Sequence, residues 1–161
     1  MMKKIVRGTL VATAVVLAFA VFDAGRTALA QDPKAAIEKR QMTMKAIGGH
    51  MKAISDFVNV GKGSAGDIAK RAAEISAAAK MLPSLFPATS GNGMVTGVKT
   101  DALGVIWTDM AYFTRIFATL DKEAVELQRV ALSGDKAAIQ ARMGMLGKNA
   151  CGACHRTFRA K

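Results

Sequence analysis

The chain ends in "KNACGACHRTFRAK" (residues 148–161), and the arrangement of the whole protein follows from this stretch. It places Cys151, Cys154 and His155 within five positions, and the chain has no other cysteine and only one other histidine. Two cysteines three positions apart, followed directly by histidine, form the attachment pattern of c-type haem. On a helix, positions i and i+3 lie on neighbouring sides, so both thiols can reach one porphyrin edge. We therefore predict one haem c, covalently held by two thioether bonds, with His155 as the proximal iron ligand.

Three other interpretations of the cysteines compete with haem attachment. A structural zinc site needs four ligands, and His50 is the only further strong donor of nitrogen or sulfur. A thioredoxin-like redox pair is expected among alternating strands and helices, which the sequence does not predict. A disulfide across two intervening residues closes a very short loop and stabilises little. The pattern favours covalent haem over all three.

Upstream of this motif the sequence shows four amphipathic helical segments. The first follows Asp32-Pro33, a cap residue with proline at the first helical position. Its apolar residues recur at helical spacing: Ile37, Met44, Ile47, Met51, Ile54 and Val58. Similar stripes occupy residues 68–82 and 103–127, and a fourth begins after residues 133–135 and enters the cysteine motif. This pattern predicts an all-α fold, an antiparallel four-helix bundle with the haem attached near the C-terminus.

The first thirty residues are typical of an export signal. Basic residues at positions 3, 4 and 7 precede an apolar run over 8–22, and "ALA" (28–30) provides a cleavage site. The run is too short for a membrane anchor. We predict cleavage of residues 1–30, Sec export to the periplasm, and one haem domain over 31–161 without a membrane span.

Removal of the signal leaves 19 basic and 11 acidic residues, a net charge of +8. An exported protein rarely meets nucleic acid, so we predict no nucleic-acid partner. The charge instead favours periplasmic or membrane-bound redox proteins with acidic docking surfaces, and Lys148 and Lys161 are candidates for steering them.

Four stretches resemble the class II c-type cytochromes, the cytochrome c prime family. They are "RQMTMKAIGGHMKAI" (40–54), "MLPSLFP" (81–87), "IWTDMAYF" (106–113) and "CGACHRTFR" (151–159). The resemblance spans nearly all of residues 32–161 and implies the same four-helix bundle. It also implies that a homodimer is possible.

The resemblance implies roles for further residues. Arg40 pairs with a haem propionate, and Arg159 screens the proximal side of the ring. Met44, four residues after Arg40, faces the sixth coordination position, where the low-spin branch of the family carries methionine. Because Arg40 and Met44 are an i, i+4 pair, they share a helix face. Met44 as a pliable core residue and Met51 as the ligand remain alternatives.

The sequence-based prediction is therefore a periplasmic, low-spin electron carrier with His155 and Met44 as axial ligands. The alternative is a five-coordinate, high-spin protein that binds nitric oxide or carbon monoxide. No carboxylate pair or nucleophile–base pair is evident, so we do not expect an enzyme. His50 is expected on the surface, and Met42 points away from Met44.

Overall fold

A computed structural model describes residues 32–161, and the predicted signal over residues 1–30 lies outside them. The regular secondary structure of the described residues is helical apart from one isolated bridge between Ala102 and Arg159, and residues 86–104 form a loop of turns and irregular chain. Its elements are α1 (Pro33–Val60), α2 (Ala65–Met81), a 3-10 turn η1 (Leu82–Leu85), α3 (Val105–Thr108), α4 (Met110–Ala131), α5 (Lys136–Leu146), a π-helical turn η2 (Gly147–Gly152) and α6 (Ala153–Phe158).

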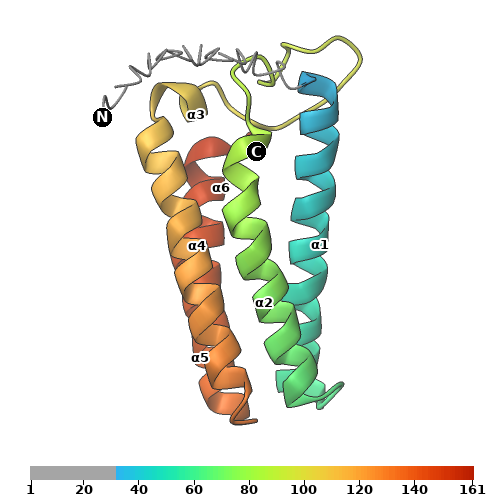
Figure 1. The fold of residues 1–161 in the computed structure, drawn as a ribbon, viewed down its shortest axis with the longest axis vertical. Helices are drawn as coiled ribbons and strands as arrows, with labels where there is room; N and C mark the ends of the chain where they lie inside the picture. The colour runs from blue at the N-terminus through green and yellow to red at the C-terminus, as the bar shows by residue number, and fades with distance from the viewer. Residues whose placement is uncertain (1–31) are drawn as a thin grey trace, which may run out of the picture.

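The long helices form an antiparallel four-helix bundle (Figure 1), so the predicted fold class is confirmed. Helix α2 packs on α1 and α4, and α5 packs on α4 and α1, which closes the ring. The fourth helix of the bundle is composite, because α5, η2 and α6 follow one another without a loop. The cysteine motif occupies the end of this helix.

Local sequence determines where the helices end and begin at the short α1–α2 and α4–α5 connections. Gly61 adopts a left-handed conformation, with φ of 71°, and ends α1. Ser64 and Asp67 form a reciprocal capping box at the start of α2. The Asp135 carboxylate accepts two backbone hydrogen bonds at the start of α5. These caps set the short connections that make neighbouring helices antiparallel.

Two features differ from the periodic pattern of the sequence. The third predicted helix is split at Asp109, whose side chain accepts a hydrogen bond from the Tyr112 backbone N–H and so starts α4. The fourth helix changes to π-helical geometry over Gly147–Gly152, immediately where the cysteines begin. Local π-helical turns are frequent at functional sites, because they re-aim the side chains that follow.

The core contains the apolar stripes of all four helices. In α1, Ile37, Ile47 and Ile54 are buried, whereas Met44 and Met51 of the same stripe stay half-buried. Phe113 and Leu127 of α4 are 1% and 0% exposed and anchor the centre. Within residues 32–161, no helix combines the length and apolarity needed to cross a membrane.

Candidate functional site

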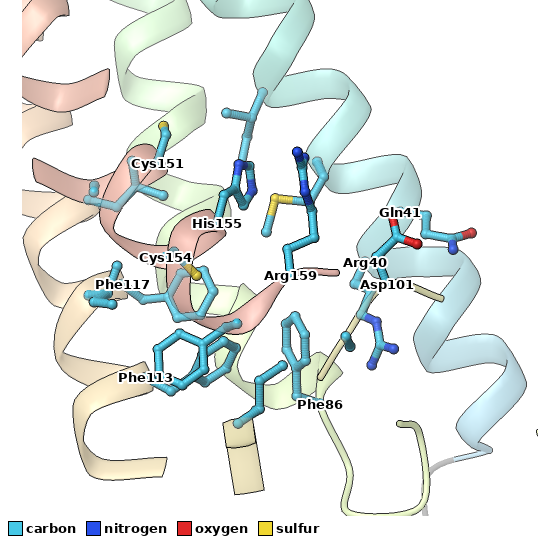
Figure 2. A pocket seen from close by; sticks show the side chains of 18 of the residues that line it. Arg40, Gln41, Phe86, Asp101, Phe113, Phe117, Cys151, Cys154, His155 and Arg159 are labelled. Atoms are coloured by element: carbon cyan, nitrogen blue, oxygen red, sulfur yellow. The ribbon is translucent and has the colours of Figure 1, made fainter. Parts of the chain in front are cut away.

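A cavity of about 540 Å³ separates α1 from the C-terminal end of the fourth helix. Figure 2 shows that Cys151, Cys154, His155 and Arg159 reach it from η2, α6 and the residue after α6, with the rings of Phe86 and Phe113 below them in this view. The rings form its apolar end and pack edge-on: Phe86 lies 4.7 Å from Phe113, and Phe113 lies 5.0 Å from Phe117, between centroids. The cavity is therefore mostly apolar, with its polar groups gathered at the mouth.

The cysteine motif supplies the chemical groups on one side of the cavity. Cys151 and His155 are half-buried and Cys154 is buried. Burial raises the pKa of Cys151, and it raises the pKa of Cys154 to about 11, with a smaller contribution from Cys151. Burial also lowers the pKa of His155, and the charge of Arg159 lowers it further. At neutral pH the site therefore holds two neutral thiols and favours a neutral imidazole.

The π-helical turn that carries Cys151 depends on a glycine. A Cβ on Gly152 would lie 3.2 Å from the Gly147 carbonyl oxygen and 2.9 Å from Nη1 of Arg156. The lack of a side chain therefore lets the turn close beneath the motif. On the α4 side, Asn149 of the same turn donates a hydrogen bond of 3.4 Å to Oε1 of Glu123. The turn that carries Cys151 is thus hydrogen-bonded to α4.

The opposite wall comes from α1. Met44, Ile47, Gly48 and Met51 line it, so the predicted Met44 and its alternative Met51 both face the cavity. Met42 is 65% exposed and does not line this cavity.

His50, expected on the surface, is half-buried because α2 covers it. Its Nδ1 lies 3.3 Å from Oε2 of Glu74, a residue of α2. His50 does not line the cavity and so stands apart from the cysteine motif.

Arg40 lines the cavity, but its guanidinium is engaged by the protein. It is 3% exposed. Its Nη atoms donate to the carbonyl oxygens of Leu85 and Ser90, at 3.4 and 2.6 Å, and to the hydroxyls of Ser90 and Thr100, at 2.8 and 2.7 Å. It also lies 4.6 Å from the centroid of the Phe86 ring. The four Nη hydrogens thus have protein acceptors, so the propionate role stays a prediction that would rely on Nε–H.

Arg159 is positioned by backbone hydrogen bonds of its neighbours, whereas the Arg40 side chain is itself hydrogen-bonded. The chain after α6 pairs with residues 101–103, because Leu103 N–H donates to Phe158 O at 3.0 Å and Ala160 N–H donates to Asp101 O at 2.8 Å. This short pairing places Arg159 at the cavity beside His155 (Figure 2). Arg159 is exposed, and within residues 32–161 its side chain makes no hydrogen bond or ion pair. The predicted screening role suits this placement and stays a prediction.

The alternatives for the cysteines gain no support from the site. Among residues 32–161, no group of three or more His, Cys, Asp or Glu side chains is placed to hold a metal ion. A redox-active pair needs a lowered thiol pKa, whereas burial raises both here.

The residues do fit a covalently bound haem. Two unbonded thiols and an imidazole line one mostly apolar cavity, and its volume is in the range of small-molecule cofactor sites, roughly 300–1,000 Å³. Neutral imidazole is the form that ligates a metal.

Several lining residues were not predicted from the sequence. Gln41 and Gly48 lie three and four positions from Met44, so helical spacing alone would have found them, whereas Lys45 follows Met44 directly and lies four positions after Gln41. Phe86 and Asp101 come from the segment between α2 and α3, which carries no periodic signal.

Comparison with known proteins decides the family. The family model described as Cytochrome C' matches residues 35–159. The chain belongs to the cytochrome c' family. Among curated relatives, cytochrome c' of Rhodospirillum rubrum is 34% identical over 91% of this chain and 96% of its own length. Members of the family bind a covalent c-type haem, and Cys151 and Cys154 supply the two thiols that this attachment requires.

Solved cytochrome c' structures share the bundle. One, described as having an unusual ligand-controlled dimer dissociation, matches with a TM-score of 0.73 at 30% identity, over 81% of this chain and 98% of its own. A nitric oxide complex of a variant cytochrome c' from Alcaligenes xylosoxidans matches with a TM-score of 0.66 at 25% identity, over 81% and 98% of the two chains. The covalent haem, the bundle and the electron-transport class of the sequence-based prediction are therefore confirmed. The low-spin, methionine-ligated branch is not.

Proposed function

We propose that this cytochrome c' family member is a periplasmic haem protein with a five-coordinate iron that takes up nitric oxide or carbon monoxide. When bound, the haem supplies an iron that exchanges single electrons and can accept a diatomic ligand. Cys151 and Cys154 hold the ring covalently, and His155 provides the iron ligand from α6. The observation that carries the proposal is the wall opposite His155, where Met44, Ile47 and Met51 of α1 present apolar side chains to the cavity.

The comparisons support gas uptake over the His/Met electron carrier predicted from the sequence. The Rhodospirillum rubrum relative is a cytochrome c', and a variant cytochrome c' of the same fold is described as a nitric oxide complex. An apolar wall offers a neutral diatomic molecule a favourable environment, because little polar surface has to lose water when the molecule enters. Ile47 contributes a buried branched side chain to this wall.

One observation keeps a second candidate, the low-spin electron carrier. Met44 is half-buried, lines the cavity and lies on the wall opposite His155. A thioether is a soft neutral ligand, and Met/His ligation raises the reduction potential of haem. In this second function the Met44 thioether would occupy the sixth coordination position, which in the first function is available to nitric oxide or carbon monoxide.

The chain's own residues support a non-enzymatic role. Among residues 32–161, Asp101 is the only carboxylate that lines the cavity, and it lies at the mouth on the segment paired with Arg159. General acid–base chemistry needs a positioned proton donor and acceptor near the reacting group. A single carboxylate at the rim, beside two thiols used for attachment, does not form such a pair.

Basic residues near the mouth support an acidic partner for electron exchange. Lys45 and Arg159 line the cavity from opposite sides, and both are exposed. Exposed charges of one sign raise association rates with oppositely charged proteins at low ionic strength. A homodimer is also proposed, since a related cytochrome c' is described as a dimer that dissociates under ligand control.

Carbon monoxide binding to the purified, reduced protein tests the function. The proposal expects rapid, saturable uptake by the wild type, with a similar rate in Met44→Ala. The electron-carrier function instead expects no uptake by the wild type, and uptake that appears only when the Met44 thioether is removed. Gln41→Ala is a matched control on the same helix, because this residue lines the mouth without a ligating atom suited to iron.

A further inference from the structure

Residues 99–103 form a strap at the mouth of the cavity, and α1 holds the first half of this strap. Nη2 of Arg40 donates a hydrogen bond to Oγ1 of Thr100 at 2.7 Å. The side-chain amide of Gln41 donates to the carbonyl oxygen of Lys99 at 2.8 Å. Thr100 is 7% exposed and lines the cavity, so its hydroxyl is a buried link between the strap and α1.

The second half of the strap pairs with the end of the chain. The Leu103 N–H donates to the Phe158 carbonyl oxygen at 3.0 Å, and the Ala160 N–H donates to the Asp101 carbonyl oxygen at 2.8 Å. In Figure 2, Asp101 is seen between Arg159 and helix α1. The strap is therefore hydrogen-bonded to both walls of the cavity.

The helix that carries His155 needs support at its C-terminal end. Helix α6 continues directly from η2, which supports its start, but it ends at Phe158, close to the chain terminus, where structure usually frays. The carbonyl oxygens of the last helical turn have no partner within the helix. The strap supplies a donor to one of them, the Phe158 carbonyl oxygen, and so caps this helix from outside.

We propose that Thr100 is a positioning residue for His155, through the link that its hydroxyl makes between α1 and the strap. One oxygen joins the two sides, because Oγ1 accepts from Arg40 and also, at 3.3 Å, from the N–H of Ala102. Ala102 is the strap residue that is bridged to Arg159. The opposite wall of the cavity thus helps to set the position of the His155 helix. This role rests on His155 as the proposed iron ligand and does not depend on uptake of a gas.

Three threonine variants isolate the hydroxyl. Valine has nearly the shape of threonine but no hydrogen-bonding group, so Thr100→Val breaks the link at Oγ1. Thr100→Ser keeps the hydroxyl and should preserve the link. Thr114→Val is the matched control, because Thr114 is half-buried in α4, does not line the cavity, and donates to carbonyl oxygens of its own helix.

Two measurements on the haem-loaded protein test the role, and neither uses a gas. Hydrogen exchange of residues 153–161, followed by mass spectrometry, should be about tenfold faster in Thr100→Val, because the chain end opens more easily without the buried acceptor. The reduction potential should fall in the same variant. A looser α6 admits water beside His155, and water favours the oxidised iron, which carries the greater positive charge. Thr100→Ser and Thr114→Val should leave exchange within about twofold of the wild type and the potential unchanged.

Each outcome decides the proposal. Equal exchange in Thr100→Val and Thr114→Val would overturn it, as would faster exchange with an unchanged potential, which indicates a role in stability alone. A wild type that takes up no carbon monoxide contradicts the proposed gas uptake and leaves both comparisons valid. If Thr100→Val fails to accumulate with haem, native-state exchange of the wild type decides. Residues 99–103 and 158–160 should then open together, with the same dependence on denaturant, and a chain end that opens independently of the strap would overturn the proposal.

Discussion

Replacing Arg40 with methionine tests whether this residue anchors the wall of the cavity. Methionine keeps much of the aliphatic volume but removes the guanidinium, and with it the four hydrogen bonds to Leu85, Ser90 and Thr100. The Ser90 hydroxyl keeps its bond to the Pro87 carbonyl oxygen, and Thr100 Oγ1 still accepts from the Ala102 N–H. The variant therefore leaves two buried carbonyl oxygens, those of Leu85 and Ser90, without these donors.

The magnitude follows from those two groups. A buried acceptor left without a partner costs about 1–3 kcal/mol. In the wild type, the cost of burying the Arg40 cation offsets part of the stabilisation that its hydrogen bonds provide. The same burial lowers the pKa of Arg40 to about 10. We therefore expect Arg40→Met to reduce the free energy of unfolding by about 2–4 kcal/mol.

The assay is denaturant unfolding of the haem-loaded protein, with hydrogen exchange of residues 86–102 as a local readout. Arg115→Met is the matched control, because Arg115 also lies against an aromatic ring, 5.6 Å from the Tyr112 centroid, but is exposed. It should change stability by less than about 0.5 kcal/mol. Ser90→Ala should be strongly non-additive with Arg40→Met. Additive effects, or equal losses in Arg40→Met and Arg115→Met, would refute the anchoring role.

Three further predictions concern attachment and stability. Cys151→Ala combined with Cys154→Ala should yield protein without covalently attached haem, whereas the single variants keep one thioether bond; mass spectrometry of the denatured chains measures this. Hydrogen bonds from Ser64 lower the pKa of Asp67, so their stabilisation is present above the unfolded-state pKa of about 3.9 and is lost as the pH falls. The stability difference between wild type and Ser64→Ala should therefore narrow below that pH in denaturant titrations, and a constant difference would contradict the assignment. Gly61→Ala should destabilise by about 1 kcal/mol, because Gly61 has a φ of 71°, whereas Gly144→Ala in the helix interior should stabilise; thermal unfolding distinguishes the two signs.

The bundle was predictable because its helices obey a simple period. The apolar stripe from Ile37 to Ile54 and the capping residues Asp32 and Ser64 are local signals, and local signals determine where helices begin and which face is buried. The haem motif was equally local, since all three of its groups lie within five positions. Both were therefore accessible without coordinates.

The rest of the site depends on contacts between distant segments. Arg40 and Thr100 are sixty positions apart, and only the fold shows that they are hydrogen-bonded. The pairing of residues 101–103 with the chain around Arg159 likewise has no periodic pattern. The π-helical turn is a small change of geometry in a continuous helix, which an apolar stripe does not reveal.

The spin state of the oxidised protein tests the central claim, a haem held by Cys151, Cys154 and His155 with its α1 side open. Electron paramagnetic resonance of the purified ferric protein measures it directly, with Met44→Ala as the companion sample. We predict a high-spin signal in the wild type that Met44→Ala leaves essentially unchanged. A low-spin wild type that becomes high-spin in Met44→Ala would contradict it and assign the sixth coordination position to Met44.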